Sequence, residues 1–137
     1  LQVVAAVAGV ASGAAAEIVH EILGGRVWPH EIETLVVRIR EELALLGEAV
    51  ACVKAQTAGN AYRDLYARKL VDLAIDLVVA ALFCDHAAAS PRKLAVAKRW
   101  LSERLPRVRM LKEQICSGDT STLSDFETLA GPLPAAD

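Results

Sequence analysis

The chain has 137 residues, the length of a single domain that can bury a substantial core. Hydrophobic residues make up 54% of it but aromatic residues only 4%, so the core consists mainly of Ala, Val and Leu, and the abundance of strong helix formers predicts an all-α fold. The net charge of −2 indicates no particular partner, and no catalytic constellation stands out. We expect one domain over residues 1–137, an antiparallel helical bundle of three to four long helices with a short C-terminal helix.

Residues 1–25 predict a weakly helical lead-in. Residues 1–16 carry no charge, lack the basic flank of a signal peptide, and are too short and alanine-rich to span a bilayer convincingly. Because the chain begins without methionine, we expect an interior fragment or a processed chain. Gly9 and Gly13 lie on one helical face, where they would let another helix approach closely. The alternative is a weak or partly irregular helix, because both glycines lower helix propensity.

Residues 29–56 form the clearest amphipathic helix in the main bundle, which we expect to cover residues 29–117. Pro29 suits a first helical turn, and Glu31 and Glu33 favour the positive end of the helix dipole. One apolar stripe predicts the buried face: Ile32, Leu35, Val36, Ile39, Leu43, Leu46, Val50 and Val53. The turn at residues 57–60 ends this helix, and Asn60 is a candidate N-cap for the next one.

Residues 61–89 predict the central helix of the bundle. Turning this stretch by 100° per residue places the polar residues Arg68, Lys69, Asp72 and Asp76 on one stripe, while nearly all of the remaining circumference is apolar. Such a helix needs neighbours on most sides. We therefore expect side chains such as Leu77 and Leu82 to be buried.

Residues 91–116 predict one kinked helix. Ser90 is a candidate N-cap, and Pro106 should bend the helix by removing one backbone donor. The apolar positions keep one phase through Pro106: Leu94, Ala97, Leu101, Leu105, Val108, Leu111 and Ile115. Residues 118–137 predict a tail in which Ser124 and Glu127 form a capping box that opens a short helix.

The basic residues gather in this last long helix. Residues 92–112 contain eight Lys and Arg residues but a single acidic residue, Glu103. This stretch therefore has a net charge of +7, and the rest of the chain has a net charge of −9. We expect a basic region and an acidic region to meet within the fold or across an interface. Nucleic acid is a weaker alternative, because Trp100 is the only stacking aromatic in the stretch and no known reader motif accompanies it.

Three cysteines, Cys52, Cys84 and Cys116, fall in helical patterns. Because their number is odd, we interpret them as free thiols in a reducing compartment, which predicts a cytoplasmic location. Cys84, His86 and Cys116 could also be read as a metal cluster, but a single Cys-x-His pair is a weak signal.

The long helices resemble the extra C-terminal helical domain of the very-long-chain type of acyl-CoA dehydrogenase. The resemblance depends first on the run Arg68-Lys69-Leu70-Val71-Asp72-Leu73-Ala74-Ile75-Asp76-Leu77 and the apolar residues after it. The order of elements supports it, and together they cover about three quarters of the chain. The alanine-rich residues 1–25 do not clearly match the family's variable, membrane-associated stretch.

The resemblance implies a parent flavoenzyme of fatty-acid β-oxidation that binds FAD and desaturates acyl-CoA thioesters between Cα and Cβ. It implies that the proton-abstracting carboxylate, the flavin pocket and the thioester pocket lie in a catalytic core before residue 1. No catalytic, cofactor-binding or metal-ligating residue is therefore assigned here. The implied role of the helical domain is to pack against that core and to hold a dimer, with the core or a second subunit as its partner.

Five residues are candidates for such an interface: Asp72, Asp76, Trp100, Arg104 and Arg107. Asp72 and Asp76 lie one turn apart and could in principle perform acid–base chemistry or bind a metal. With Arg68 four residues before Asp72, we favour an ion-pair stripe that faces solvent or another domain.

Two other hypotheses remain open. One is a free-standing α-helical interaction module that docks an acidic partner through the basic helix at residues 91–116. The other is a membrane-surface domain that uses the lead-in and the same basic helix.

Overall fold

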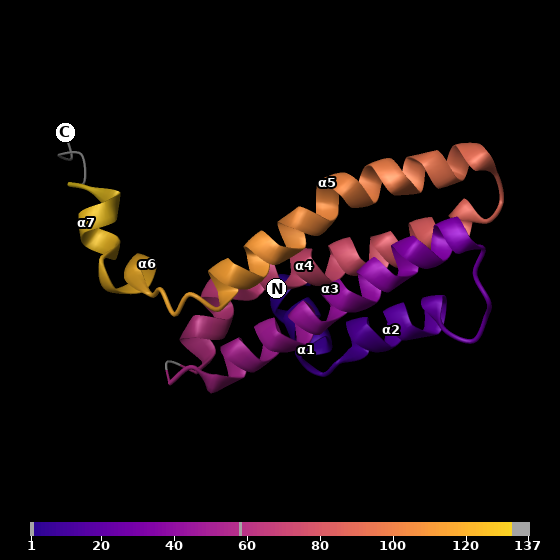
Figure 1. The fold of residues 1–137 in the computed structure, drawn as a ribbon. Coiled ribbons are helices and arrows are strands. Elements are labelled where there is room, and N and C mark those ends of the chain that lie inside the picture. The colour runs from indigo at the N-terminus through magenta and orange to yellow at the C-terminus, as the bar shows by residue number, and fades with distance from the viewer. Residues whose placement is uncertain (1, 58, 133–137) are drawn as a thin grey trace.

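The computed structural model describes residues 2–57 and 59–132, and these residues fold into seven helices with no strand among them. Three long helices, α3 (His30–Ala55), α4 (Asn60–Ala87) and α5 (Pro91–Ile115), form the bundle, and α4 runs antiparallel to both α3 and α5, as Figure 1 shows. Two shorter helices, α1 (Gln2–Ala11) and α2 (Ala14–Leu23), pack against them. The predicted all-α bundle is confirmed.

The lead-in is two helices rather than one weak helix. Gly13 adopts a φ of 94°, a left-handed conformation that glycine accepts readily, and the chain turns there. The apolar segments on either side, Ala5–Ala11 and Ala14–Leu23, are inclined by 63°. In the described residues no single helix is long and apolar enough to cross a membrane, and only this bent pair meets the length and composition criteria jointly.

Helix α3 buries the predicted apolar stripe. Seven of its eight members are buried and Val50 is half-buried. Just before the helix, Trp28 is also buried, and its indole Nε1 donates to the carbonyl of Leu23 at 3.1 Å, which joins the end of α2 to the start of α3.

Helix α4 is the central element, as predicted, because it contacts α1, α2, α3 and α5. Leu77 is fully buried, but Leu82 is 40% exposed and Ile75 is 51% exposed, so the expectation for Leu82 was wrong. The reason is that α1 and α2 are short and leave part of the α4 surface uncovered. The predicted Asn60 cap is also wrong, since Asn60 is the first helical residue and Gly59, with a φ of 56°, precedes it.

Helix α5 continues through Pro106 as one helix that bends along its course (Figure 1). The proline is exposed, and the apolar positions on both sides of it remain on the buried face. At the start of the helix Ser90 acts as the predicted N-cap, its Oγ accepting from the Lys93 amide at 3.3 Å.

The tail holds two short helices, α6 (Ser121–Ser124) and α7 (Phe126–Ala130), where the sequence predicted one. The expected capping box does not form. Ser124 is the last residue of α6, and its hydroxyl donates to the Thr120 carbonyl at 3.4 Å, so it does not cap α7. Helix α7 is followed by Gly131, which has a φ of 73°.

A disulfide joins Cys52, near the end of α3, to Cys116, just after α5, and their Cα atoms lie 5.3 Å apart. The prediction of three free thiols was therefore wrong for these two residues. The antiparallel packing of α3, α4 and α5 brings the C-terminal ends of α3 and α5 together across 64 residues of sequence, a proximity that the spacing of the cysteines does not reveal. Only Cys84 is free among the cysteines, and it is buried.

Candidate functional site

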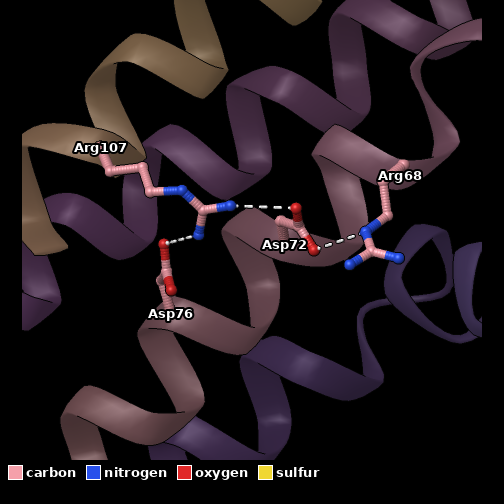
Figure 2. A network of polar contacts seen from close by, with 4 residues as sticks. All are labelled: Arg68, Asp72, Asp76 and Arg107. Atoms are coloured by element: carbon pink, nitrogen blue, oxygen red, sulfur yellow. Dashed lines mark hydrogen bonds and ion pairs between the residues drawn. The ribbon is translucent and has the colours of Figure 1, made fainter.

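A polar network joins α4 to α5 within the bundle. Figure 2 shows the Arg107 guanidinium, which comes from α5, reaching two carboxylates on successive turns of α4. Its Nη1 donates to Asp76 Oδ2 at 2.6 Å, and its Nη2 donates to Asp72 Oδ2 at 3.0 Å. The other oxygen of Asp72 accepts from Arg68 Nε at 3.0 Å, one turn earlier on the same helix.

Burial differs across this network. The Asp76 side chain is 6% exposed, the Asp72 side chain is 20% exposed and the Arg107 side chain is 31% exposed. Burial alone would lower the pKa of Arg107, but the hydrogen bonds and charges of Asp76 and Asp72 outweigh it, so the pKa is raised. A buried carboxylate is strongly unfavourable without a partner, and Arg107 supplies that partner. The network therefore fixes how α4 and α5 pack.

The predicted ion-pair stripe is confirmed for Arg68 and Asp72 but is only partly solvated. Lys69 takes no part in the described ion pairs, and its Nζ lies 5.5 Å from the ring centroid of Tyr66. The expectation that Asp76 faces solvent or another domain was wrong, because α5 of the same bundle covers it and supplies its partner Arg107. The sequence of α4 alone does not show this placement.

A second buried carboxylate belongs to Glu42 on α3, which is 2% exposed. Arg109 on α5 donates to its Oε1 through Nε at 2.8 Å and through Nη2. This bonding, together with the Glu42 charge, raises the pKa of Arg109. Glu42 Oε2 has no hydrogen-bond partner among the described residues. Glu42 was not among the predicted site residues, although its spacing from Ile39 and Leu46 puts it on the apolar face of α3.

Two tyrosines of α4 hold the chain after α5. Tyr62 is fully buried and donates through its hydroxyl to the Ile115 carbonyl at 2.6 Å, while the same oxygen accepts from the Gly118 amide at 3.1 Å. Tyr66 donates to the Asp119 carbonyl at 2.9 Å. The Asp119 carboxylate accepts from the Ser121 amide at 3.0 Å, a bond that lowers the pKa of that carboxyl group.

An apolar groove of about 340 Å³ runs between α4 and the α1–α2 pair. We call it the α4 groove. All of its lining residues are apolar: Ala6, Gly9, Val10, Ala14, Ala15, Ile18, Val71, Ala74, Ile75, Val78 and Val79. Ile18 is 46% exposed and Ile75 is 51% exposed, so large apolar side chains meet solvent here. A Cβ added at Gly9 would meet nothing within 4 Å, so Gly9 does not mediate a close helix contact.

The remaining interface candidates lie on α5. Trp100 is half-buried and packs against Phe83 of α4, with ring centroids 5.2 Å apart. Arg104 is exposed. Five of the eight basic residues at positions 92–112 form ion pairs with described residues. The basic helix is therefore largely paired with acidic residues within the fold. These five are Lys98, Arg99, Arg107, Arg109 and Lys112.

The structure gives no support to the Cys84, His86 and Cys116 cluster as a metal site. Cys116 is bonded to Cys52, and burial raises the pKa of the Cys84 thiol to about 12, so Cys84 remains a neutral packing residue. Among residues 2–57 and 59–132, no group of three or more His, Cys, Asp or Glu side chains is arranged to hold a metal ion.

Comparison with known proteins identifies no relative: no protein-family model, curated protein or solved structure matches the chain. The function must therefore be inferred from the geometry of the described residues. Its main features are an apolar groove and charged networks that stabilise helix packing.

Proposed function

We propose that this chain is a non-catalytic helical domain of an acyl-CoA dehydrogenase-like flavoprotein, in which it packs against the catalytic core and helps to hold a dimer. The observation that carries the proposal is the α4 groove, where Ile18 and Ile75 expose apolar surface to solvent. Exposed apolar surface of this kind is typical of contacts with a protein or a membrane and of ligand-binding grooves, and a protein contact fits a domain that packs against a core.

The parent class is supported by the run at residues 68–77 and by the order of the long helices. In this proposal the parent binds FAD and desaturates acyl-CoA thioesters between Cα and Cβ. The flavin, the thioester pocket and the proton-abstracting carboxylate belong to its catalytic core, and no residue of this chain is assigned to them. The buried network around Arg107 gives the domain a fixed helix packing that suits a structural role.

The free-standing module that docks an acidic partner through residues 91–116 has less support. Most basic residues of that helix already have acidic partners in the described part of the chain, such as Asp76 for Arg107 and Glu42 for Arg109. A basic face whose charges are paired internally attracts an acidic partner less strongly. The cytoplasmic location stays a prediction, and the disulfide removes two of the three free thiols on which it was based.

The reading frame upstream of Leu1 tests the parent class. A continuous frame that encodes a flavin-binding acyl-CoA dehydrogenase core supports the proposal, and a frame that encodes no such core refutes it.

The role of the groove is tested in that full-length protein with Ile75→Lys, which places a charge in the groove, and with Val37→Lys as the matched control. Val37 is 42% exposed on α3 and does not line the groove. We expect Ile75→Lys to loosen the domain from the core, measured as faster proteolytic release of the domain, while Val37→Lys has no effect. Equal release rates for both variants and the unaltered protein would contradict docking through the groove.

A further inference from the structure

The tail forms an arm that lies apart from the bundle. We define the arm as residues 120–131, which include α6 and α7. Figure 1 shows both helices beyond the end of α5, and in the described residues they pack on each other without an extended contact to α1–α5. Three large apolar side chains of the arm meet solvent: Leu123 is 49%, Phe126 is 65% and Leu129 is 66% exposed.

A second cavity lies at the opposite end of the bundle, where α4 turns into α5. We call it the α4–α5 cleft. It has a volume of about 450 Å³ and is lined by Phe83, His86, Ser90, Arg92, Lys93 and Val96. Val96 is 47% exposed, and neither Arg92 nor Lys93 belongs to an ion pair of the described residues.

The arm and the α4–α5 cleft are complementary in polarity and in charge. The arm places Asp125 and Glu127 beside its exposed apolar side chains and contains no basic residue. The cleft places Arg92 and Lys93 beside Phe83 and Val96. Opposite charges around an apolar contact favour association and fix its orientation.

The arm of one molecule does not reach the cleft of the same molecule. From Lys93 to Cys116 the chain rises along α5 by about 35 Å, so the two features lie at opposite ends of the bundle (Figure 1). Helices α6 and α7 contain four and five residues, which together span about 14 Å as helix. Only an unfolded arm would cover the distance back, so a folded arm that occupies the cleft has to come from another molecule.

We propose that two copies of this chain associate by placing the arm of each molecule in the α4–α5 cleft of the other. Reciprocal exchange makes the two contacts equivalent and closes a two-fold dimer. Phe126 and Leu129 bury their exposed surface against Phe83 and Val96, and Glu127 meets Lys93. The interface uses only surfaces of this chain, so it does not depend on the identity of the parent enzyme.

Sedimentation equilibrium of the full chain, without reductant, tests the proposal. We expect a dimer whose dissociation constant rises with salt concentration. Phe126→Ser and Lys93→Glu should each raise that constant by about tenfold or more, since a contact at the centre of an interface contributes this much. The circular dichroism spectrum of each variant should remain unchanged, because both side chains are exposed. The melting temperature of Phe126→Ser should match that of the unaltered protein at concentrations where both are monomeric.

A charge exchange and a control complete the design. Glu127→Lys combined with Lys93→Glu should restore most of the association lost in Lys93→Glu alone, because the pair is rebuilt with opposite signs. Ile75→Lys, which alters the α4 groove, should leave the dissociation constant unchanged. A monomer at the highest soluble concentration, or a dimer that Ile75→Lys disrupts and Phe126→Ser does not, would overturn the proposal.

Discussion

Removal of the Cys52–Cys116 disulfide gives a quantitative test of the bundle. The cross-link joins the C-terminal ends of α3 and α5 across 64 residues of sequence. In the chain-entropy description a closed loop of this length stabilises the folded state by about 4 kcal/mol, because the cross-linked unfolded chain has fewer conformations. A single domain has a total stability of about 5–15 kcal/mol, so the effect is large and measurable.

The assay is urea unfolding followed by far-ultraviolet circular dichroism, with and without dithiothreitol. We expect the Cys52→Ser, Cys116→Ser double variant to unfold at a lower urea concentration, and reduced wild-type protein to behave like the variant. The reduced protein should keep its helical content, since the Tyr62 hydroxyl still binds the Ile115 carbonyl at 2.6 Å. Dithiothreitol should have no effect on the double variant, which serves as the control. A shift below about 1 kcal/mol on reduction would refute the reasoning.

Three further predictions concern the interior. Arg107→Met should cost about 3–5 kcal/mol because it leaves the Asp76 carboxylate buried without a partner, whereas Asp76→Leu combined with Arg107→Met should recover most of this loss in the same urea assay. Leu77 is fully buried, so Leu77→Ala should lower the free energy of unfolding by about 2–5 kcal/mol. Leu82 is 40% exposed, so Leu82→Ala should lower it by less than about 1 kcal/mol. Equal losses for the two variants would contradict the difference in burial. Cys84 should be the single thiol detected in unfolded, unreduced protein and should not react in the folded state at pH 8. Burial raises the pKa of the Cys84 thiol from 9.0 to about 12, so the stability that this thiol contributes is complete below pH 9 and declines as pH rises toward 12. Urea unfolding at both ends of this pH range measures the decline.

The site was harder to predict than the fold, because its residues are paired between helices. The spacing of Arg68 and Asp72 within α4 was sufficient to predict their ion pair. The pairing of Asp76 with Arg107, by contrast, depends on how α5 is placed against α4, and no local pattern specifies that placement. The disulfide was also not predictable from local patterns, because the spacing of the cysteines in the sequence does not show that the ends of α3 and α5 lie together.

The sequence by itself determined the three long helices and the buried faces of α3 and α5. The apolar stripe of α3 and the phase of α5 through Pro106 are periodic patterns, and periodicity follows from the local geometry of the backbone. Only the tertiary structure decided which apolar surface remains exposed to solvent. Residues 70–84 are apolar around most of the helix, yet Ile75 and Leu82 meet solvent because α1 and α2 turn at Gly13 and cover only part of α4. Exposure depends on which neighbours are present, and the pattern of one helix does not encode the length and direction of the others.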